Sequence, residues 1–183
     1  MLVALIILAV LAVLLIFYYN SLVAARQRVK NAWSQIDVQL QRRFDLIPNI
    51  VESVKGYMGY ESDVLEKVTT LRSSWSKASS VSEKATLNNQ LSDTLKSIMA
   101  ISERYPDLKA NQSFLDLQEE LRNTENKISF SRQFYNDSAT MYNTKLEVFP
   151  SNIIAGLFKF MPESLFVVEN DEARKNVKVN FNN

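Results

Sequence analysis

The strongest constraint on this chain is an amino-terminal stretch that carries no charged side chain. No Asp, Glu, Lys or Arg precedes Arg26, although the 183 residues include 21 basic and 20 acidic ones. Residues 2–17 are all apolar, and Tyr18 and Tyr19 extend the run to a helix of about 27 Å, enough to cross a hydrocarbon core. The tyrosines then lie where aromatic rings favour the membrane interface. Residues 1–20 are therefore predicted to be a transmembrane anchor.

The anchor prediction rests on the large apolar and aromatic side chains of this run. They are Leu2, Val3, Leu5, Ile6, Ile7, Leu8, Val10, Leu11, Val13, Leu14, Leu15, Ile16, Phe17, Tyr18 and Tyr19. A cleavable signal peptide is the alternative, because Val23-Ala24-Ala25 satisfies a small-residue cleavage rule. The run lacks a basic flank before it and is long for a signal peptide, so we favour the anchor.

The residues that flank the anchor predict its orientation. Arg26, Arg28 and Lys30 follow it closely, whereas the amino side offers only the α-amine. Basic flanks remain in the cytoplasm. We therefore expect a single-pass membrane protein with its body on the cytoplasmic side.

Composition excludes several functional classes. The chain has no histidine and no cysteine, which removes the usual zinc and haem sites, disulfides, thiol nucleophiles and imidazole bases. Asp116, Glu119, Glu120 and Glu125 are typical of carboxylate-bridged metal bundles, but such sites also need Glu-x-x-His motifs. A net charge of +1 argues against nucleic-acid binding. We expect no enzyme activity, no catalytic residues, no cofactor and no metal site.

The three glycines and four prolines are too few for an all-β domain. Instead, apolar residues recur every three and four positions behind the anchor, which predicts packed helices. The first helix continues out of the membrane and ends at the charged run of residues 42–45. The second spans residues 47–75, with Asp45 as its cap, Pro48 in its first turn and Glu61 as a polar position in its seam.

Two further helices follow in the predicted bundle. The third begins at Ser80-Val81-Ser82-Glu83, where Ser80 and Glu83 have capping-box spacing, and Tyr105-Pro106 ends it. The fourth has a strict seven-residue seam, which is typical of a helix packed in a bundle. That seam consists of Phe114, Leu121, Ile128, Tyr135, Tyr142 and Phe149. Residues 21–149 are therefore predicted to form an antiparallel up-and-down four-helix bundle, in which the second and fourth helices are the longer pair.

The C-terminal part, residues 150–183, is predicted to hold a short amphipathic helix and a tail. The helix spans residues 151–161 and either caps the open end of the bundle or lies in a membrane interface. Its apolar face would be the second membrane contact: Ile153, Ile154, Leu157, Phe158 and Met161. In the tail, residues 165–168 and the alternating residues 177–181 predict two short strands that pair with each other or with a neighbouring subunit.

Several polar groups are interpreted as structural. Arg42, Arg43 and Asp45 have the composition of a head-group or anion site, but solvated charge at a helix–helix turn is the favoured interpretation. Glu61 is either a buried acid or a polar core residue that fixes register. Tyrosine–asparagine pairs begin at positions 19, 135 and 142. We expect them to make hydrogen bonds between helices.

The chain resembles the LemA family of bacterial membrane-anchored helical proteins over nearly its whole length. The motifs that carry this resemblance are Tyr19-Asn20-x-Leu22-Val23-x-x-Arg26, Ala32-Trp33-Ser34-Gln35-Ile36-Asp37, Arg42-Arg43-x-Asp45-Leu46-Ile47-Pro48-Asn49, Tyr105-Pro106-x-Leu108-Lys109-Ala110-Asn111, Thr124-Glu125-Asn126, Tyr135-Asn136, Tyr142-Asn143 and Phe149-Pro150-x-Asn152-Ile153. The resemblance implies one span, a four-helix bundle and no enzyme activity. Tyr60 before Glu61 departs from the family, which more often has His there, so no metal or proton role carries over to that pair.

Some members of the family are associated with internal membrane compartments, including those of magnetic bacteria. The resemblance therefore implies membrane shaping as a candidate function. Because one copy cannot impose curvature, we expect a homo-oligomer whose copies pack side by side and organise or remodel a lipid membrane. A stiff joint favours this function, since residues 18–25 contain neither Gly nor Pro. The alternative is a non-catalytic membrane adaptor that recruits an unidentified protein partner.

Overall fold

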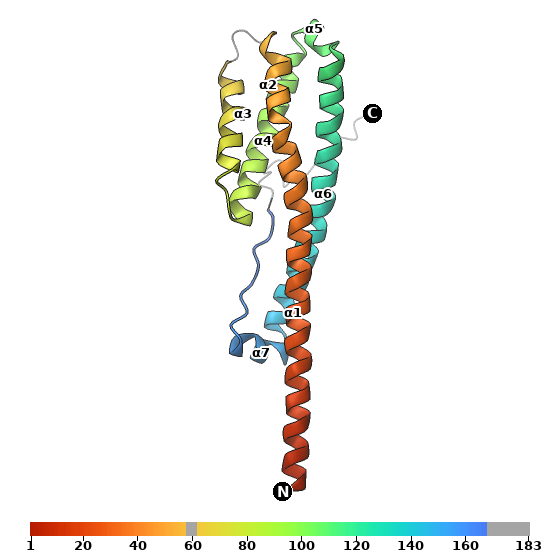
Figure 1. Ribbon diagram of the computed structural model, residues 1–183, viewed down its shortest axis with the longest axis vertical. Coiled ribbons are helices and arrows are strands. Elements are labelled where there is room, and N and C mark those ends of the chain that lie inside the picture. The colour runs from red at the N-terminus through yellow and green to blue at the C-terminus, as the bar shows by residue number, and fades with distance from the viewer. Residues whose placement is uncertain (58–61, 168–183) are drawn as a thin grey trace, which may run out of the picture.

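A computed structural model of the protein describes residues 1–57 and 62–167, and these residues form an all-helical structure (Figure 1). The helices are α1 (Leu2–Asp45), α2 (Ile47–Lys55), α3 (Ser62–Trp75), α4 (Val81–Ser102), α5 (Pro106–Lys109), α6 (Gln112–Glu147) and α7 (Ser151–Leu157). The first helix and α2 run away from the amino terminus, α3 returns, α4 runs away again and α6 returns beside α1. The predicted up-and-down helical bundle is confirmed.

The helix α1 is continuous from the apolar amino-terminal segment to Asp45. Its 44 residues include no Gly or Pro, so nothing in the sequence interrupts the backbone hydrogen bonds. It ends at the charged run, as predicted, and Pro48 lies in the first turn of α2. The predicted cap is wrong, because Asp45 remains within α1 and accepts a hydrogen bond from Gln41 at 2.8 Å.

The predicted second helix is divided into α2 and α3. Gly56 ends α2, and a turn at residues 56–57 follows. Glycine in a helix interior costs about 1 kcal/mol relative to alanine, so the helix is weakest at this point. The apolar seam continues on both sides because α2 and α3 face the same core. Tyr60 and Glu61 lie outside the described residues.

The start of α4 is fixed by the capping box that the sequence predicts. The Ser80 hydroxyl accepts a hydrogen bond from the Glu83 amide, and the Glu83 carboxylate accepts one from the Ser80 amide, both at 3.1 Å. The two bonds satisfy amides that have no partner within the helix. Most of the predicted seam of α6 is buried as well, with Phe114, Leu121, Ile128, Tyr135 and Tyr142 in the core.

The long pair of helices is α1 and α6, and not the predicted second and fourth. With 36 residues, α6 is about 54 Å long, whereas α3 with 14 and α4 with 22 are about 21 Å and 33 Å. The shorter helices cover only the end of the pair that is remote from the amino terminus (Figure 1). The part nearer the amino terminus needs another partner.

That partner is the extended chain after α7, which runs back along the long pair (Figure 1). Its Phe166 is 1% exposed, and the ring centroid lies 6.3 Å from that of Trp33 on α1. The predicted strand over residues 165–168 is wrong for residues 165–167, which have no strand assignment. The peptide groups of Phe166 and Val167 bond to side chains of helices instead. The predicted strand at 177–181 lies outside the described residues.

The amphipathic helix and the seam of α6 both end earlier than predicted. The helix α7 stops at Leu157, because Lys159 adopts a left-handed backbone conformation with φ of 54°. Phe149 lies after the end of α6 and is 79% exposed, so it is not a seam residue. Both departures occur where the chain leaves α6, crosses in α7 and turns back.

We expect Phe166→Ala to destabilise the full chain in mild detergent by about 3–5 kcal/mol, because it removes a fully buried aromatic side chain. Val167→Ala is the matched control, since its side chain is 51% exposed, and we expect a change within about 0.5 kcal/mol. Urea unfolding followed by tryptophan fluorescence measures both. Equal effects of the two variants would show that the tail is not part of the folded core.

Candidate functional site

The amino-terminal part of α1 is an apolar surface without a protein partner. Its most apolar window has a mean hydropathy of 3.0, and none of the window is buried in the structure. Among the described residues, the helix that begins at Leu2 is the one that is long and apolar enough to cross a membrane. All large apolar side chains of the predicted anchor from Leu2 to Phe17 are exposed, while Tyr18 and Tyr19 are half-buried.

A second exposed apolar cluster lies at α7. Ile153, Leu157 and Met161 are 60–72% exposed, and Phe158 is 46% exposed. Ile154 differs from the other predicted contact residues, because it is half-buried. Ala155 is buried on the opposite side of α7, where the helix packs on α1 and α6. The helix α7 therefore packs on the bundle and leaves an apolar face exposed.

The exposed face of α7 lies at the level where the anchor ends. The Tyr19 ring centroid is 4.7 Å from that of Phe158 and 5.9 Å from that of Phe160. The guanidinium of Arg26 lies 5.0 Å from the Phe160 ring centroid, and the Lys145 ammonium donates to the Ser21 hydroxyl at 2.8 Å. In Figure 1, α7 crosses beside α1 at this level. We call these groups of α1, α6 and α7 the membrane-proximal elbow.

Two tyrosine–asparagine pairs on α6 hold the chain that leaves α7. The Tyr142 hydroxyl donates to the Met161 carbonyl at 3.0 Å, and the Asn143 side chain donates to the Glu163 carbonyl and accepts from the Glu163 amide, both at 2.9 Å. These bonds recognise peptide groups, so they do not depend on the side chains of the tail.

The second pair repeats this arrangement one heptad earlier in α6. Tyr135 donates to the Ser164 carbonyl at 2.6 Å, while Asn136 donates to the Phe166 carbonyl at 3.1 Å and accepts from the Phe166 amide at 2.8 Å. Seven residues of helix advance about 10.5 Å and three extended residues about 10 Å, so the two repeats stay in register. We call the two pairs the Tyr-Asn clamp.

The electrostatics of the clamp keep its phenols in the donor form. Burial, and to a smaller extent the charge of Glu163, raise the pKa of Tyr135 to about 12. Burial also raises the pKa of Tyr142 above its usual value. Both hydroxyls therefore remain protonated at neutral pH and continue to donate to the tail carbonyls.

The interpretation of the tyrosine–asparagine pairs as bonds between helices is wrong for positions 135 and 142. Their partners belong to the extended tail, which the sequence does not mark as a packing element. The first pair has a different environment, because the Tyr19 ring contacts Phe158 and Phe160 next to α7. The seven-residue spacing between the pairs on α6 is the signal that indicated a repeated contact.

A second polar arrangement surrounds Arg43, which is buried and not part of a solvated turn as expected. Its Nη1 donates to Asn88 at 2.7 Å and to Ser92 at 3.0 Å, and it lies 2.6 Å from the Glu125 carboxylate. Burial lowers the pKa of Arg43, while the charge of Glu125 opposes this shift. Arg42 next to it is exposed and pairs with Glu120 at 2.6 Å.

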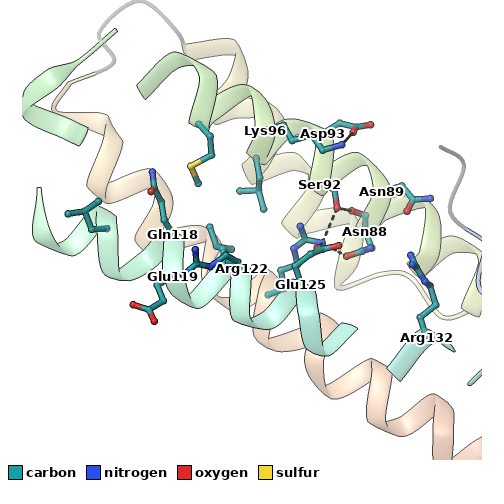
Figure 2. A pocket seen from close by; sticks show the side chains of 15 residues that line it. Asn88, Asn89, Ser92, Asp93, Lys96, Gln118, Glu119, Arg122, Glu125 and Arg132 are labelled. Carbon is teal, nitrogen blue, oxygen red and sulfur yellow. Dashed lines mark hydrogen bonds and ion pairs between the residues drawn. The ribbon is translucent and has the colours of Figure 1, made fainter. Parts of the chain in front are cut away.

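A pocket of 990 Å³ opens beside the Arg43 group, between α4 and α6 (Figure 2). Its polar and charged lining residues are Arg43, Asn88, Asn89, Ser92, Asp93, Lys96, Gln118, Glu119, Arg122, Glu125 and Arg132. Four of these side chains are cationic and three are carboxylates, so the lining has no strong field of one sign. The arrangement suits a polar partner and offers no nucleophile with an adjacent base.

The exposed apolar helix and the bundle it enters define a membrane-associated helical protein. A sequence profile of the LemA family matches residues 32–181. The chain belongs to the LemA family, as its motifs indicated. Proteins of this family are not known as enzymes.

Individual relatives agree with this assignment. The chain is 31% identical over 150 residues to Protein LemA of Metamycoplasma hominis. The aligned region covers 76% of this chain and 67% of the relative. It is 22% identical over 194 aligned positions to Magnetosome proteins MamQ 1 and MamQ 2 of Paramagnetospirillum magneticum. Each alignment covers 89% of this chain and 71% of the relative.

We expect the double variant Asn136→Ala with Asn143→Ala to release the tail from α6. Each substitution removes two hydrogen bonds to tail peptide groups, so the amides of Glu163 and Phe166 lose their acceptors. Hydrogen exchange measured by mass spectrometry would become faster over residues 158–167. Asn123→Ala with Asn126→Ala is the control, because both side chains are exposed on α6. Unchanged exchange in the clamp variant would contradict the assigned role.

Arg42 and Arg43 provide a neighbouring exposed and buried pair. We expect Arg43→Ala to destabilise the protein by about 3–5 kcal/mol, because it leaves the groups around Arg43 without their partner. We expect less than about 1 kcal/mol for Arg42→Ala, because surface ion pairs contribute little. Urea unfolding in detergent compares the two. Similar losses for both arginines would rule out the structural importance of the buried contacts.

Proposed function

We propose that this protein is a membrane-anchored bundle that self-assembles to organise or remodel the membrane. The observation that carries the proposal is the continuity of α1, which runs from Leu2 in the apolar segment to Asp45 in the bundle without interruption. A continuous helix transmits tilt between the bundle and the bilayer, whereas a flexible linker does not. Several copies packed side by side would therefore impose a common tilt on their anchors.

A second membrane contact strengthens this coupling in the proposal. The helix α7 presents Ile153, Leu157, Phe158 and Met161 at the level of Tyr19, where the anchor ends. Apolar side chains of an interfacial helix insert at the boundary between head groups and acyl chains. The Tyr-Asn clamp ties the chain after α7 to α6. Each copy would thus hold the bilayer at two points with a fixed relative geometry.

The lateral surface of the long pair supports self-assembly. Phe130, Phe134 and Met141 are 48–75% exposed, and their spacing sets them on one face of α6 within about 40°. Val148, which directly follows α6, is 47% exposed. Val38 of α1 is also exposed and lines a shallow groove of 690 Å³ together with Phe130. We call these five residues the lateral stripe. Exposed apolar side chains that share one face suit a protein contact better than water.

The stripe also fits the orientation that the anchor would give to neighbouring copies. Copies anchored in one bilayer stand parallel, so their stripes occur at the same height.

We propose that the bundle lies on the cytoplasmic side, in agreement with the basic residues after the anchor. The names of the two magnetosome relatives fit a role at membranes.

An adaptor is the second candidate function, and the pocket beside Arg43 favours it. The pocket lies between α4 and α6, in the part of the bundle remote from the anchor, and it is lined by charged groups of both signs. A polar partner from the aqueous phase would bind there without any need for self-assembly.

The test is electron microscopy of cells that express the full chain, and of the protein extracted gently with its lipids. We expect ordered arrays or protein-coated curved membranes. Phe130→Glu with Phe134→Glu should abolish the arrays, because burying charges in a lateral contact is costly. Ser129→Glu with Thr140→Glu is the control, since it adds the same charge at exposed positions of α6 outside the stripe.

Monomers with flat membranes for the unmodified protein would refute self-assembly and favour the adaptor. Loss of arrays in both double variants would assign the effect to charge alone and reject the lateral stripe as the contact.

A further inference from the structure

The backbone at Lys159 is unusual for its residue type. Its φ of 54° lies in the left-handed region, where glycine and asparagine are the residues that fit most readily. Lys159 follows the last turn of α7 and its side chain is exposed. A lysine at this position therefore costs backbone energy, and no described contact with another side chain offsets that cost.

Lys159 lies between the apolar face of α7 and the cations of the elbow. Phe158 before it touches Tyr19, and Phe160 after it lies under Arg26. Lys145 on α6 donates to Ser21 at the same level of α1. These contacts place Arg26 and Lys145 beside the end of the anchor, and Lys159 lies between the two rings that contact Tyr19.

Carboxylates do not cancel this charge. Glu147 is two residues from Lys145 on α6 and is the nearest carboxylate along that helix. Glu163 is held by its backbone at Asn143 and lies close enough to Tyr135 and Tyr142 to raise their pKa values. The charge of Arg26 acts on the same Tyr142 and lowers its pKa, so Glu163 offsets part of the charge of Arg26. Among the described residues, the elbow thus presents three cations, Arg26, Lys145 and Lys159, against two carboxylates, Glu147 and Glu163.

We propose that the elbow binds the head groups of anionic phospholipids, with Lys159 as the contact residue that the left-handed turn presents. The proposal rests on the second membrane contact of α7 and assigns its lipid preference. Apolar side chains beside cations are the combination that interfacial segments use, the former inserting below the head groups and the latter attracting their phosphates.

The stability of α7 alone does not explain why a lysine occupies position 159. A cation near the end of a helix is favourable, but α7 has only seven residues and the effect at an exposed site is small. Asparagine or glycine would also allow the same turn at lower backbone cost. The charge itself is therefore the property that Lys159 adds.

The experiment uses the full chain in nanodiscs, either of phosphatidylcholine alone or with phosphatidylglycerol added. The chain has no cysteine, so Ile153→Cys introduces a unique site for an environment-sensitive fluorophore on the exposed face of α7. Quenching by nitroxide lipids reports insertion, and quenching by aqueous iodide reports exposure. We expect insertion to increase with the fraction of anionic lipid.

The variants separate the charge from the backbone. Lys159→Asn removes the charge and still fits the left-handed turn. We expect the ratio of inserted to exposed α7 in anionic nanodiscs to fall about fivefold, which is the effect of one lysine near an anionic surface. Lys159→Arg should retain insertion. Lys127→Asn is the control, because Lys127 is exposed on α6 beside the groove that holds Val38. Lys159→Gly should unfold at higher urea concentration than the unmodified chain while it inserts less.

The outcomes distinguish this inference from the function on which it rests. Equal insertion in both lipid compositions, or no effect of Lys159→Asn, would overturn the anionic head-group site and leave the membrane contact intact. Exposure to iodide in both compositions would overturn the membrane contact itself.

Discussion

The antiparallel contact between α1 and α6 is the interaction on which the rest of the structure depends. Both helices repeat their buried residues at seven-residue intervals, Leu22, Val29 and Ile36 on α1, and Ile128, Tyr135 and Tyr142 on α6. Such repeats keep one seam facing the partner over the whole length. The pair therefore extends well beyond α3 and α4, and its membrane-proximal half is completed by the short helix α7 and by the extended chain after it.

The need to complete this half explains why the tail folds as it does. An extended chain is thinner than a helix and suits the groove between two helices, but its peptide groups need partners when they are buried. Tyr135, Asn136, Tyr142 and Asn143 supply those partners, and Phe166 fills the end of the groove beside Trp33. The clamp thus serves the core, and it also determines where α7 lies.

The sequence predicted the elements that depend on local pattern. The charge-free segment, the end of α1, the capping box of Ser80 and most of the α6 seam follow from periodicity and neighbouring residues. It missed features set by tertiary contact, because a side chain that bonds to a distant peptide has no local signature. Arg43 shows the difference, because its charge favoured a solvated turn. Its burial depends on contacts with Asn88, Ser92 and Glu125, which lie far from it in the sequence.

The bundle also orders α7 before it meets the proposed membrane interface. A free amphipathic segment must lose conformational entropy when it enters an interface, which weakens its binding. Here the entropy of α7 is lost on folding, because its buried side packs on the long pair and the chain after it is held by the clamp. The exposed side chains of Leu157 and Met161 then meet the interface already ordered. In this proposal, interactions within the bundle strengthen a contact that lies outside it, so weakening the clamp should loosen the hold on the bilayer even though no clamp residue touches lipid.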